Sequence, residues 1–176
     1  MAKRMIFVTG GCRSGKSRFA LSYANERYCK KIFLATSEVL DDGMALRVEN
    51  HKRMRGAEWK TIEEPVEIVE RISQSQEEGA IILLDCITLW LSNLLIKGTD
   101  DSRIMEEVNR LTAAIQESPA SFIIVSNEVG MGIVPVDPLG RRFRDLSGTA
   151  NQRIAEAADA VVFMVSGIPL FLKGAI

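Results

Sequence analysis

One segment constrains the fold of this chain more than any other: a glycine-rich loop between an apolar run and a helical pattern. The loop reads GGCRSGKS and satisfies the GxxxxGK[ST] pattern. Residues 5–8 before it are apolar and predict a strand, and residues 17–27 after it predict a helix. In such a loop, backbone N–H groups turn toward phosphate oxygens, and the start of the helix adds the positive end of its dipole. The sequence therefore predicts a P-loop that binds the phosphates of a nucleoside triphosphate.

Two side chains of this loop have expected chemical roles. The Lys16 ammonium should reach the outer phosphates, and the Ser17 hydroxyl should bind Mg²⁺. Asp85 ends the apolar run 80–84, so we expect it to complete the magnesium site or to position a nucleophile. A buried strand can also end in an aspartate that only caps the next helix, and this alternative stays open. The predicted phosphate-binding residues are Gly10, Gly11, Cys12, Arg13, Ser14, Gly15, Lys16 and Ser17.

Strand and helix patterns alternate along the rest of the chain. Further strands are predicted at 31–35, 80–84, 122–125, 160–165 and 170–172, and further helices at 42–55, 87–95, 104–116 and 138–158. The helix at 104–116 should be capped by Asp101 or Ser102. Continuous apolar strands are typical of a parallel sheet that is covered on both faces. The order predicts an α/β fold with a mostly parallel central sheet and helices on both faces, with ligands at the carboxyl ends of the strands.

Composition narrows the remaining possibilities. The 176 residues are 47% hydrophobic, which suits one buried core, so we expect a single domain spanning residues 1–176. Lys and Arg number 22 against 23 Asp and Glu, so the chain lacks the basic excess that collects nucleic acid. No apolar run is long enough for a membrane span or a signal peptide, which predicts a cytoplasmic protein. Three cysteines without CxxC spacing argue against a disulfide framework or a structural zinc.

The single histidine, His51, falls within the predicted helix 42–55. Arg47, His51 and Arg55 recur every four residues, so they project from roughly one face. A neutral imidazole is a competent nucleophile toward phosphorus, and the guanidinium groups would neutralise phosphates and a leaving pyrophosphate. Covalent nucleotidyl transfer is one interpretation. An ordinary histidine on a helix surface is the other.

The C-terminal third carries two further features. Residues 126–135 form a glycine-containing loop after the strand 122–125, where α/β proteins place ligands. The helix after Pro138 is two-sided, and Gly148 on its polar side suggests close approach by a ligand or another chain, or merely a solvated face. The expected apolar stripe is Leu139, Phe143, Leu146, Ala150, Ile154 and Ala157, and the polar stripe is Arg141, Asp145, Gly148 and Gln152.

Several segments together resemble one family, the bifunctional adenosylcobinamide kinase/adenosylcobinamide-phosphate guanylyltransferases of cobalamin biosynthesis. The matching stretches are VTGGCRSGKSRFA, LATSEVLDDGMALRVENHK, NEVGMGIVP, RRFRDLSGTANQRIAEAAD and VSGIPLFLK. They cover essentially the whole chain, and NEVGMGIVP and the RFRD…G…NQ helix are far more specific than the P-loop. The resemblance implies a RecA-like P-loop NTPase fold and a homotrimer.

The resemblance also implies two reactions. ATP or GTP phosphorylates the aminopropanol hydroxyl of the corrinoid adenosylcobinamide, and GTP then gives its GMP to that phosphate through a guanylylated histidine. That histidine can only be His51, because the chain has no other. Several relatives carry Glu where this chain has Asp85, which keeps the charge with a shorter reach. Besides the P-loop, the residues implied to contact or lie near the nucleotide are Ala35, Thr36, Ser37, Lys52, Arg53, Met54, Arg55, Glu64 and Asp85.

Two rival functions remain. A simple P-loop small-molecule kinase, with His51 as a bystander, would move only the γ-phosphate. A GTPase-like switch would need a guanine-reading NKxD segment, and the nearest stretch, Asn127-Glu128-Val129-Gly130, lacks the Lys and the Asp. Apolar contact to the corrinoid could come from Trp59, Trp90 or the loop around Met131, although core packing is the expected role of both tryptophans.

Overall fold

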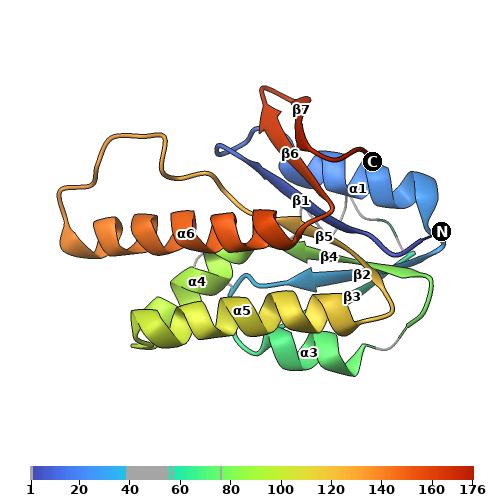
Figure 1. Ribbon diagram of the computed structural model, residues 1–176, viewed down its shortest axis with the longest axis horizontal. Coiled ribbons are helices and arrows are strands. Elements are labelled where there is room, and N and C mark those ends of the chain that lie inside the picture. The colour runs from blue at the N-terminus through green and yellow to red at the C-terminus, as the bar shows by residue number, and fades with distance from the viewer. Residues whose placement is uncertain (1, 39–55, 57, 76) are drawn as a thin grey trace.

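The computed structural model describes residues 2–38, 56, 58–75 and 77–176 (Figure 1). The strands of this part form one seven-stranded sheet in the order β3-β2-β4-β5-β1-β6-β7. All neighbouring strands are parallel except β6 and β7, which form an antiparallel hairpin at one edge. The strands are β1 Met5–Gly10, β2 Lys30–Ala35, β3 Trp59–Glu63, β4 Ala80–Asp85, β5 Ser121–Val125, β6 Ala160–Val165 and β7 Ile168–Lys173.

Helices cover both faces of the sheet, as the apolar strands predicted. Four helices, α3 to α6, pack on one face, and α1 lies on the other (Figure 1). The helices are α1 Lys16–Arg27, α3 Ile68–Gln74, α4 Ile87–Ile96, α5 Asp101–Glu117 and α6 Pro138–Ala157. The prediction of a mostly parallel α/β sheet is therefore confirmed.

Strand alternation divides the core into two layers. On β4, Ile82 and Leu84 pack under α3 to α6, whereas Ile81 and Leu83 pack on the side of α1. Side chains of successive strand residues point to opposite faces, so a strand covered on both sides must be apolar at every position. The largest buried side chain, Trp90, lies in the first layer and Trp59 lies in the second, which confirms the core-packing role expected of both tryptophans.

Three local expectations were incomplete or wrong. The strand β3 and the short helix α3 were not predicted. The strand β3 lies at the edge of the sheet, and only its first residue, Trp59, is fully buried. The cap of α5 is Asp100, whose side chain accepts a hydrogen bond from the Arg103 N–H at 2.9 Å, and not Asp101 or Ser102. Leu139, placed on the apolar stripe of α6, is 57% exposed because it lies in the first turn, beyond the sheet. The predicted helix 42–55 lies outside the described residues.

Candidate active site

The sheet order brings the P-loop and Asp85 to the same edge of the sheet. The P-loop follows β1, Asp85 ends β4, and β5 lies between these two strands. The Ser17 hydroxyl, on the first turn of α1, donates a hydrogen bond to Asp85 Oδ2 at 2.6 Å. A hydroxyl oxygen and a carboxylate therefore meet beside the phosphate loop, and oxygen donors of this kind suit Mg²⁺.

The backbone of the P-loop requires glycine at two positions. Gly10 has φ 143°, and a Cβ there would lie 2.4 Å from the Met164 carbonyl oxygen of β6. Gly15 has φ 97°, and a Cβ there would lie 3.2 Å from the Gly167 Cα in the β6–β7 turn. The hairpin also binds the loop directly, because the Gly167 N–H donates to the Ser14 carbonyl oxygen at 2.9 Å. The β6–β7 turn thus supports the phosphate loop from outside.

Lys16 is the first residue of α1 and is buried. Its Nζ donates to the carbonyl oxygens of Gly10 at 2.9 Å and Gly11 at 2.7 Å. Burial lowers the pKa of this ammonium, while nearby acidic groups, Asp85 among them, oppose the shift. The Ser14 hydroxyl is buried and finds no hydrogen-bond partner among the described residues. A buried hydroxyl without a partner is costly, and a phosphate oxygen would satisfy it.

The residues at the ends of β2 and β3 lie in a row along the same edge. Ala35 ends β2, and the Thr36 hydroxyl donates to the Cys86 carbonyl at 2.7 Å and accepts from the Cys86 N–H at 2.8 Å. That hydroxyl therefore ties the ends of β2 and β4 together. Ser37, the next residue, is half-buried.

Glu64 follows β3 at the far end of the row, roughly 19 Å from β1 at ordinary strand spacing. Its Oε1 accepts hydrogen bonds from the backbone N–H groups of Val66 and Glu67, and its Oε2 pairs with Arg71 at 3.3 Å. Burial opposes ionisation, but these N–H groups and Arg71 lower the pKa of Glu64 overall. In this arrangement Glu64 also organises the start of α3.

The predicted nucleophile lies outside the described residues. This holds for His51 and for the four residues after it that the resemblance placed near the nucleotide, Lys52, Arg53, Met54 and Arg55. In the described part of the chain, no group of three or more His, Cys, Asp or Glu side chains forms a metal cluster. A magnesium ion at Ser17 and Asp85 would therefore depend on the nucleotide phosphates and water for its other ligands.

A polar network at the same edge was missed by sequence reasoning. The Asn127 amide nitrogen donates to the Thr88 hydroxyl at 2.8 Å, and that hydroxyl lies 3.2 Å from the Cys86 sulfur. The Asn151 side-chain amide of α6 donates to the backbone carbonyl oxygen of Asn127 at 3.2 Å. The only sequence signal was the position of residues 126–135 after an apolar strand.

Gly148 lies on the polar side of α6, and the close approach by a ligand or another chain that its sequence position suggests stays a prediction. A Cβ at Gly148 would meet no described atom within 4 Å. Arg141, Asp145 and Gln152 of the same stripe are exposed. This face of α6 is open to the surroundings of the chain.

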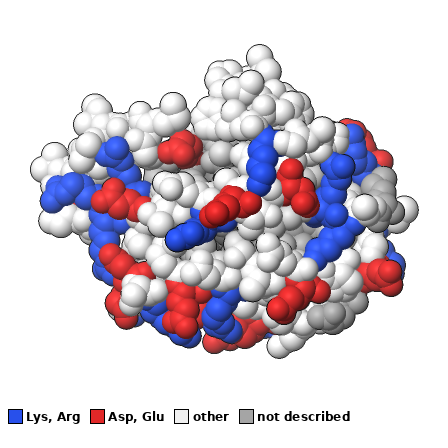
Figure 2. Space-filling view, in the orientation of Figure 1, with Lys and Arg blue, Asp and Glu red and all other residues white. Residues whose placement is uncertain are grey.

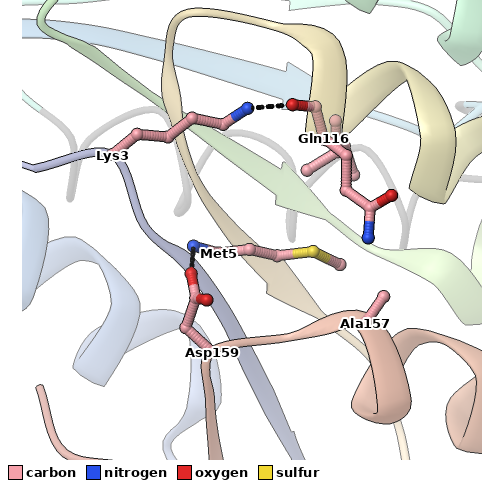
Figure 3. Close-up of a pocket in the computed structure, with 6 residues that line it drawn as sticks. Lys3, Met5, Gln116, Ala157 and Asp159 are labelled. Atoms are coloured by element: carbon pink, nitrogen blue, oxygen red, sulfur yellow. Dashed lines mark hydrogen bonds between the residues drawn. The ribbon is translucent and has the colours of Figure 1, made fainter.

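A hollow of about 230 Å³ lies at the opposite edge of the sheet (Figure 3). Lys3, Met5 and Asp159 line it at the amino ends of β1 and β6. Its polar groups bond to one another: the Met5 N–H donates to Asp159 Oδ2 at 2.8 Å and Lys3 Nζ donates to the Gln116 carbonyl at 2.5 Å. Because ligands of α/β sheets bind at the carboxyl ends of strands, this hollow is separate from the phosphate site.

Positive and negative side chains both lie on the face shown in Figure 2. None of the described helices combines the length and the apolar composition of a membrane span.

Comparison with known proteins identifies relatives along the whole chain. The family model described as cobinamide kinase / cobinamide phosphate guanyltransferase matches residues 6–172. The bifunctional adenosylcobalamin biosynthesis protein CobU of Escherichia coli is 42% identical over 181 residues, which cover 96% of this chain and 99% of that protein. CobU of Salmonella typhimurium is 43% identical with the same coverage. CobP of Pseudomonas aeruginosa, also a bifunctional adenosylcobalamin biosynthesis protein, is 41% identical over 95% of this chain and 96% of its own length.

Solved structures with low sequence identity share the fold. A protein from Pyrococcus horikoshii OT3 superposes with a TM-score of 0.59 at 9% identity, covering 98% of this chain and 87% of its own. The RadB recombinase gives a TM-score of 0.53 at 11% identity, covering 91% of this chain and 73% of its own. Together with the sheet order, these likenesses confirm the RecA-like P-loop fold.

Proposed function

Because this chain belongs to the cobinamide kinase / cobinamide phosphate guanyltransferase family, we propose that it phosphorylates adenosylcobinamide and then converts the phosphate to adenosylcobinamide-GDP. The observation that carries the proposal is the contact at 2.6 Å between Ser17 of the P-loop and Asp85 of β4. This contact supports the proposal because it brings a P-loop hydroxyl and a carboxylate together in a chain that matches the family over residues 6–172.

The first reaction is phosphoryl transfer from ATP or GTP. The acceptor hydroxyl oxygen forms a bond to the γ-phosphorus, the bond from that phosphorus to the β,γ-bridging oxygen breaks, and the hydroxyl proton is released to water. The P-loop amides and Lys16 hold the phosphates in line and balance their charge. Ser17 and Asp85 would hold Mg²⁺, which neutralises charge on the phosphates when it is bound.

The second reaction is guanylyl transfer. We propose that the His51 imidazole attacks the α-phosphorus of GTP and that pyrophosphate leaves, giving a guanylylated histidine. The corrinoid phosphate then attacks the same phosphorus, the bond to the imidazole nitrogen breaks, and GMP passes to the substrate. Lys52, Arg53, Met54 and Arg55 would contact the nucleotide during this step.

Ala35, Thr36, Ser37 and Glu64 are proposed to contact the rest of the nucleotide. They support this proposal by their position, since the ends of β2 and β3 extend the row that begins at the P-loop. We also propose a cytoplasmic location, in keeping with cysteines that are free thiols in the described chain.

The assembly proposed for this chain is a homotrimer. Two separate apolar surfaces are exposed, and a closed head-to-tail ring needs two different surfaces on each copy. We define the hairpin surface as Val165, Ile168, Leu170, Phe171 and Leu172, and the loop surface as Met131, Ile133, Val134, Val136 and Leu139. The projecting β6–β7 hairpin at the top of Figure 2 shows no charged side chains on this face.

The test of the covalent mechanism uses GTP labelled in turn at the α- and γ-phosphate. Wild-type protein with Mg²⁺ should retain α-label, and no γ-label, in a bond that is stable to base and labile to acid. His51→Asn, which keeps side-chain size without a nucleophilic nitrogen, should retain neither. Because the chain has one histidine, labelled histidine locates the residue without ambiguity.

A phosphoryl-transfer assay with the same two proteins distinguishes the bifunctional enzyme from a simple kinase. With adenosylcobinamide and γ-labelled ATP, wild type and His51→Asn should both transfer the γ-phosphate. If both proteins phosphorylate the corrinoid and wild type never holds α-label, the guanylyl-histidine mechanism is wrong and the simple P-loop kinase is correct. Failure of both transfers would contradict the proposed function as a whole.

A further inference from the structure

Four polar side-chain atoms beneath α6 are buried and find no hydrogen-bond partner among the described residues. They are Thr9 Oγ1, Ser126 Oγ, Ser147 Oγ and Asn151 Oδ1. The four residues are 8%, 0%, 0% and 8% exposed, so each is more than nine-tenths buried. Folding takes such atoms away from solvent water at a cost, and most buried polar atoms recover that cost through a partner inside the protein.

Thr9 and Ser126 lie on the face of the sheet that α6 covers (Figure 1). Phe7 and Ile124, two residues earlier on β1 and β5, pack in the layer under α3 to α6, and strand alternation points Thr9 and Ser126 the same way. The Ser126 N–H donates to the Val8 carbonyl at 3.0 Å, which continues the pairing of β1 with β5 and sets Ser126 level with Thr9. The two hydroxyls therefore come from neighbouring positions on adjacent strands, on the face opposite to α1.

The helix α6 supplies the other two atoms. Ser147 and Asn151 are one turn apart, and Ala150 between them packs in the same apolar layer. The Asn151 side-chain N–H donates at 3.2 Å to the backbone carbonyl of Asn127, the residue after Ser126. This bond assigns nitrogen and oxygen within the amide, and it brings Oδ1 close to the end of β5.

The chemistry of the four atoms suits water better than an ion. A hydroxyl can donate or accept, whereas the amide oxygen only accepts, and water offers two donors and two acceptors to such a mixed set. No charged side chain is among the four, and core neighbours such as Phe7 and Ile124 are apolar. An ion at this place would be buried next to neutral groups alone, which is costly.

We propose that ordered water binds beneath α6 and bridges Thr9 and Ser126 of the sheet to Ser147 and Asn151 of the helix. About two molecules suffice, because two waters that bond to each other and to two of the four atoms each make about three hydrogen bonds apiece, the usual number for buried water. Thr9 directly precedes Gly10, the first residue of the P-loop. The water therefore joins α6 to the strand that carries the phosphate loop, whichever reactions the protein catalyses.

The test measures the Tm of variants that each remove one hydroxyl. Thr9→Val, which keeps the shape of the side chain, and Ser147→Ala should each lower Tm by about 2–4 °C, since the water loses a partner. The double variant should lose less than the sum of the two, because either change weakens the same bridge.

Exposed positions provide the matched controls. Thr61→Val on β3 makes the first change outside the site, and Ser22→Ala on α1 makes the second. Ser22→Ala also measures the helix propensity that alanine adds, so the effect of Ser147→Ala is its difference from this control.

The direction of the change decides between water and a dry contact. If the four atoms are truly without partners, Thr9→Val and Ser147→Ala should raise Tm relative to their controls, because each removes a buried polar atom that nothing satisfies. That result, or Tm values equal to the controls, would overturn the proposal. A high-resolution crystal structure should show water within hydrogen-bond distance of Ser126 and Ser147, and a structure without it would also count against the proposal.

A comparison of salts distinguishes water from a bound cation. Wild-type Tm is measured in KCl, NaCl and choline chloride at equal ionic strength. Bound water predicts that any difference among the salts is the same in wild type and in Ser147→Ala. A stabilisation by K⁺ or Na⁺ that Ser147→Ala abolishes would show that a cation occupies the site, and the assignment to water would be wrong.

Discussion

At the scale of single residues, the contact between Ser17 and Asp85 makes the most direct prediction. Asp85→Asn keeps the shape of the side chain but removes the charge, so the Mg²⁺ concentration for half-maximal activity should rise and turnover should fall roughly a hundredfold or more. Steady-state assays over a range of Mg²⁺ measure both. Asp145→Asn, exposed on α6, should behave like wild type.

A double variant tests whether the two groups act as a unit. If Ser17 and Asp85 hold one ion, the double variant Ser17→Ala with Asp85→Asn should be only slightly less active than the less active of the two single variants. Effects that simply multiply would mean that the two side chains serve separate roles, and the shared magnesium site would be wrong.

The three cysteines should differ sharply in reactivity. Burial, with Asp85 nearby, raises the pKa of Cys86 to about 11, whereas Cys12 and Cys29 are exposed. At pH 8 only about one Cys86 thiol in a thousand is ionised, and it is also shielded from reagents. Iodoacetamide should therefore modify two cysteines of the folded protein, as peptide mass mapping would show.

The same labelling reports on nucleotide binding. Cys12 lies within the P-loop, so GTP with Mg²⁺ should slow its modification, while Cys29 at the far end of α1 serves as an internal control. Modification of Cys86 at the rate of Cys29 would contradict the buried environment described for β4.

At the scale of elements, we predict that the β6–β7 hairpin stabilises the conformation of the P-loop. Gly167 has φ 84°, its N–H bonds to Ser14, and a Cβ there would approach the Arg18 guanidinium to 3.0 Å. Gly167→Ala should therefore weaken nucleotide binding as well as stability. Calorimetric titration and thermal unfolding measure the two effects.

Gly98 provides the matched control for this strain. It has φ 80° in the turn between α4 and α5, and a Cβ there meets nothing within 4 Å. Both Ala variants should lose about 1 kcal/mol from the left-handed backbone, which lowers Tm by about 2–4 °C. Equal nucleotide affinity in the two variants would show that the hairpin does not support the P-loop.

How far the sequence predicts each element depends on how local its signal is. The P-loop, the apolar strands and α6 were predicted because their signals are a fixed motif, continuous apolar runs and helical periodicity. The strand β3 was not predicted because its sequence, WKTIE, has no continuous apolar run and buries mainly Trp59. Its position in the sheet comes from pairing with β2. The hydrogen bonds of Asn127 with Thr88 and Asn151 were not predicted. These residues are far apart in the chain, and only the strand order brings them together.

At the scale of the whole molecule, the proposed homotrimer predicts the mass in solution, and the two apolar surfaces predict which residues hold it together. Light scattering should give three copies of 19.5 kDa, about 58 kDa. A charge on either surface should break the ring, since a carboxylate would be buried without a partner. Ile133→Asp with Val136→Asp disrupts the loop surface, and Ile168→Asp with Leu170→Asp disrupts the hairpin surface. Ile96→Asp, exposed at the end of α4 outside both surfaces, should leave the mass unchanged.

Mixing the two disrupted proteins distinguishes a head-to-tail ring from symmetric pairing. In a ring, each contact joins the hairpin surface of one copy to the loop surface of the next. A loop variant still offers an intact hairpin surface, and a hairpin variant still offers an intact loop surface, so the mixture should form a heterodimer although each protein alone is a monomer. If each surface instead pairs with itself, each double variant alone should remain a dimer through its intact surface. That outcome would rule out the trimer built from these two surfaces.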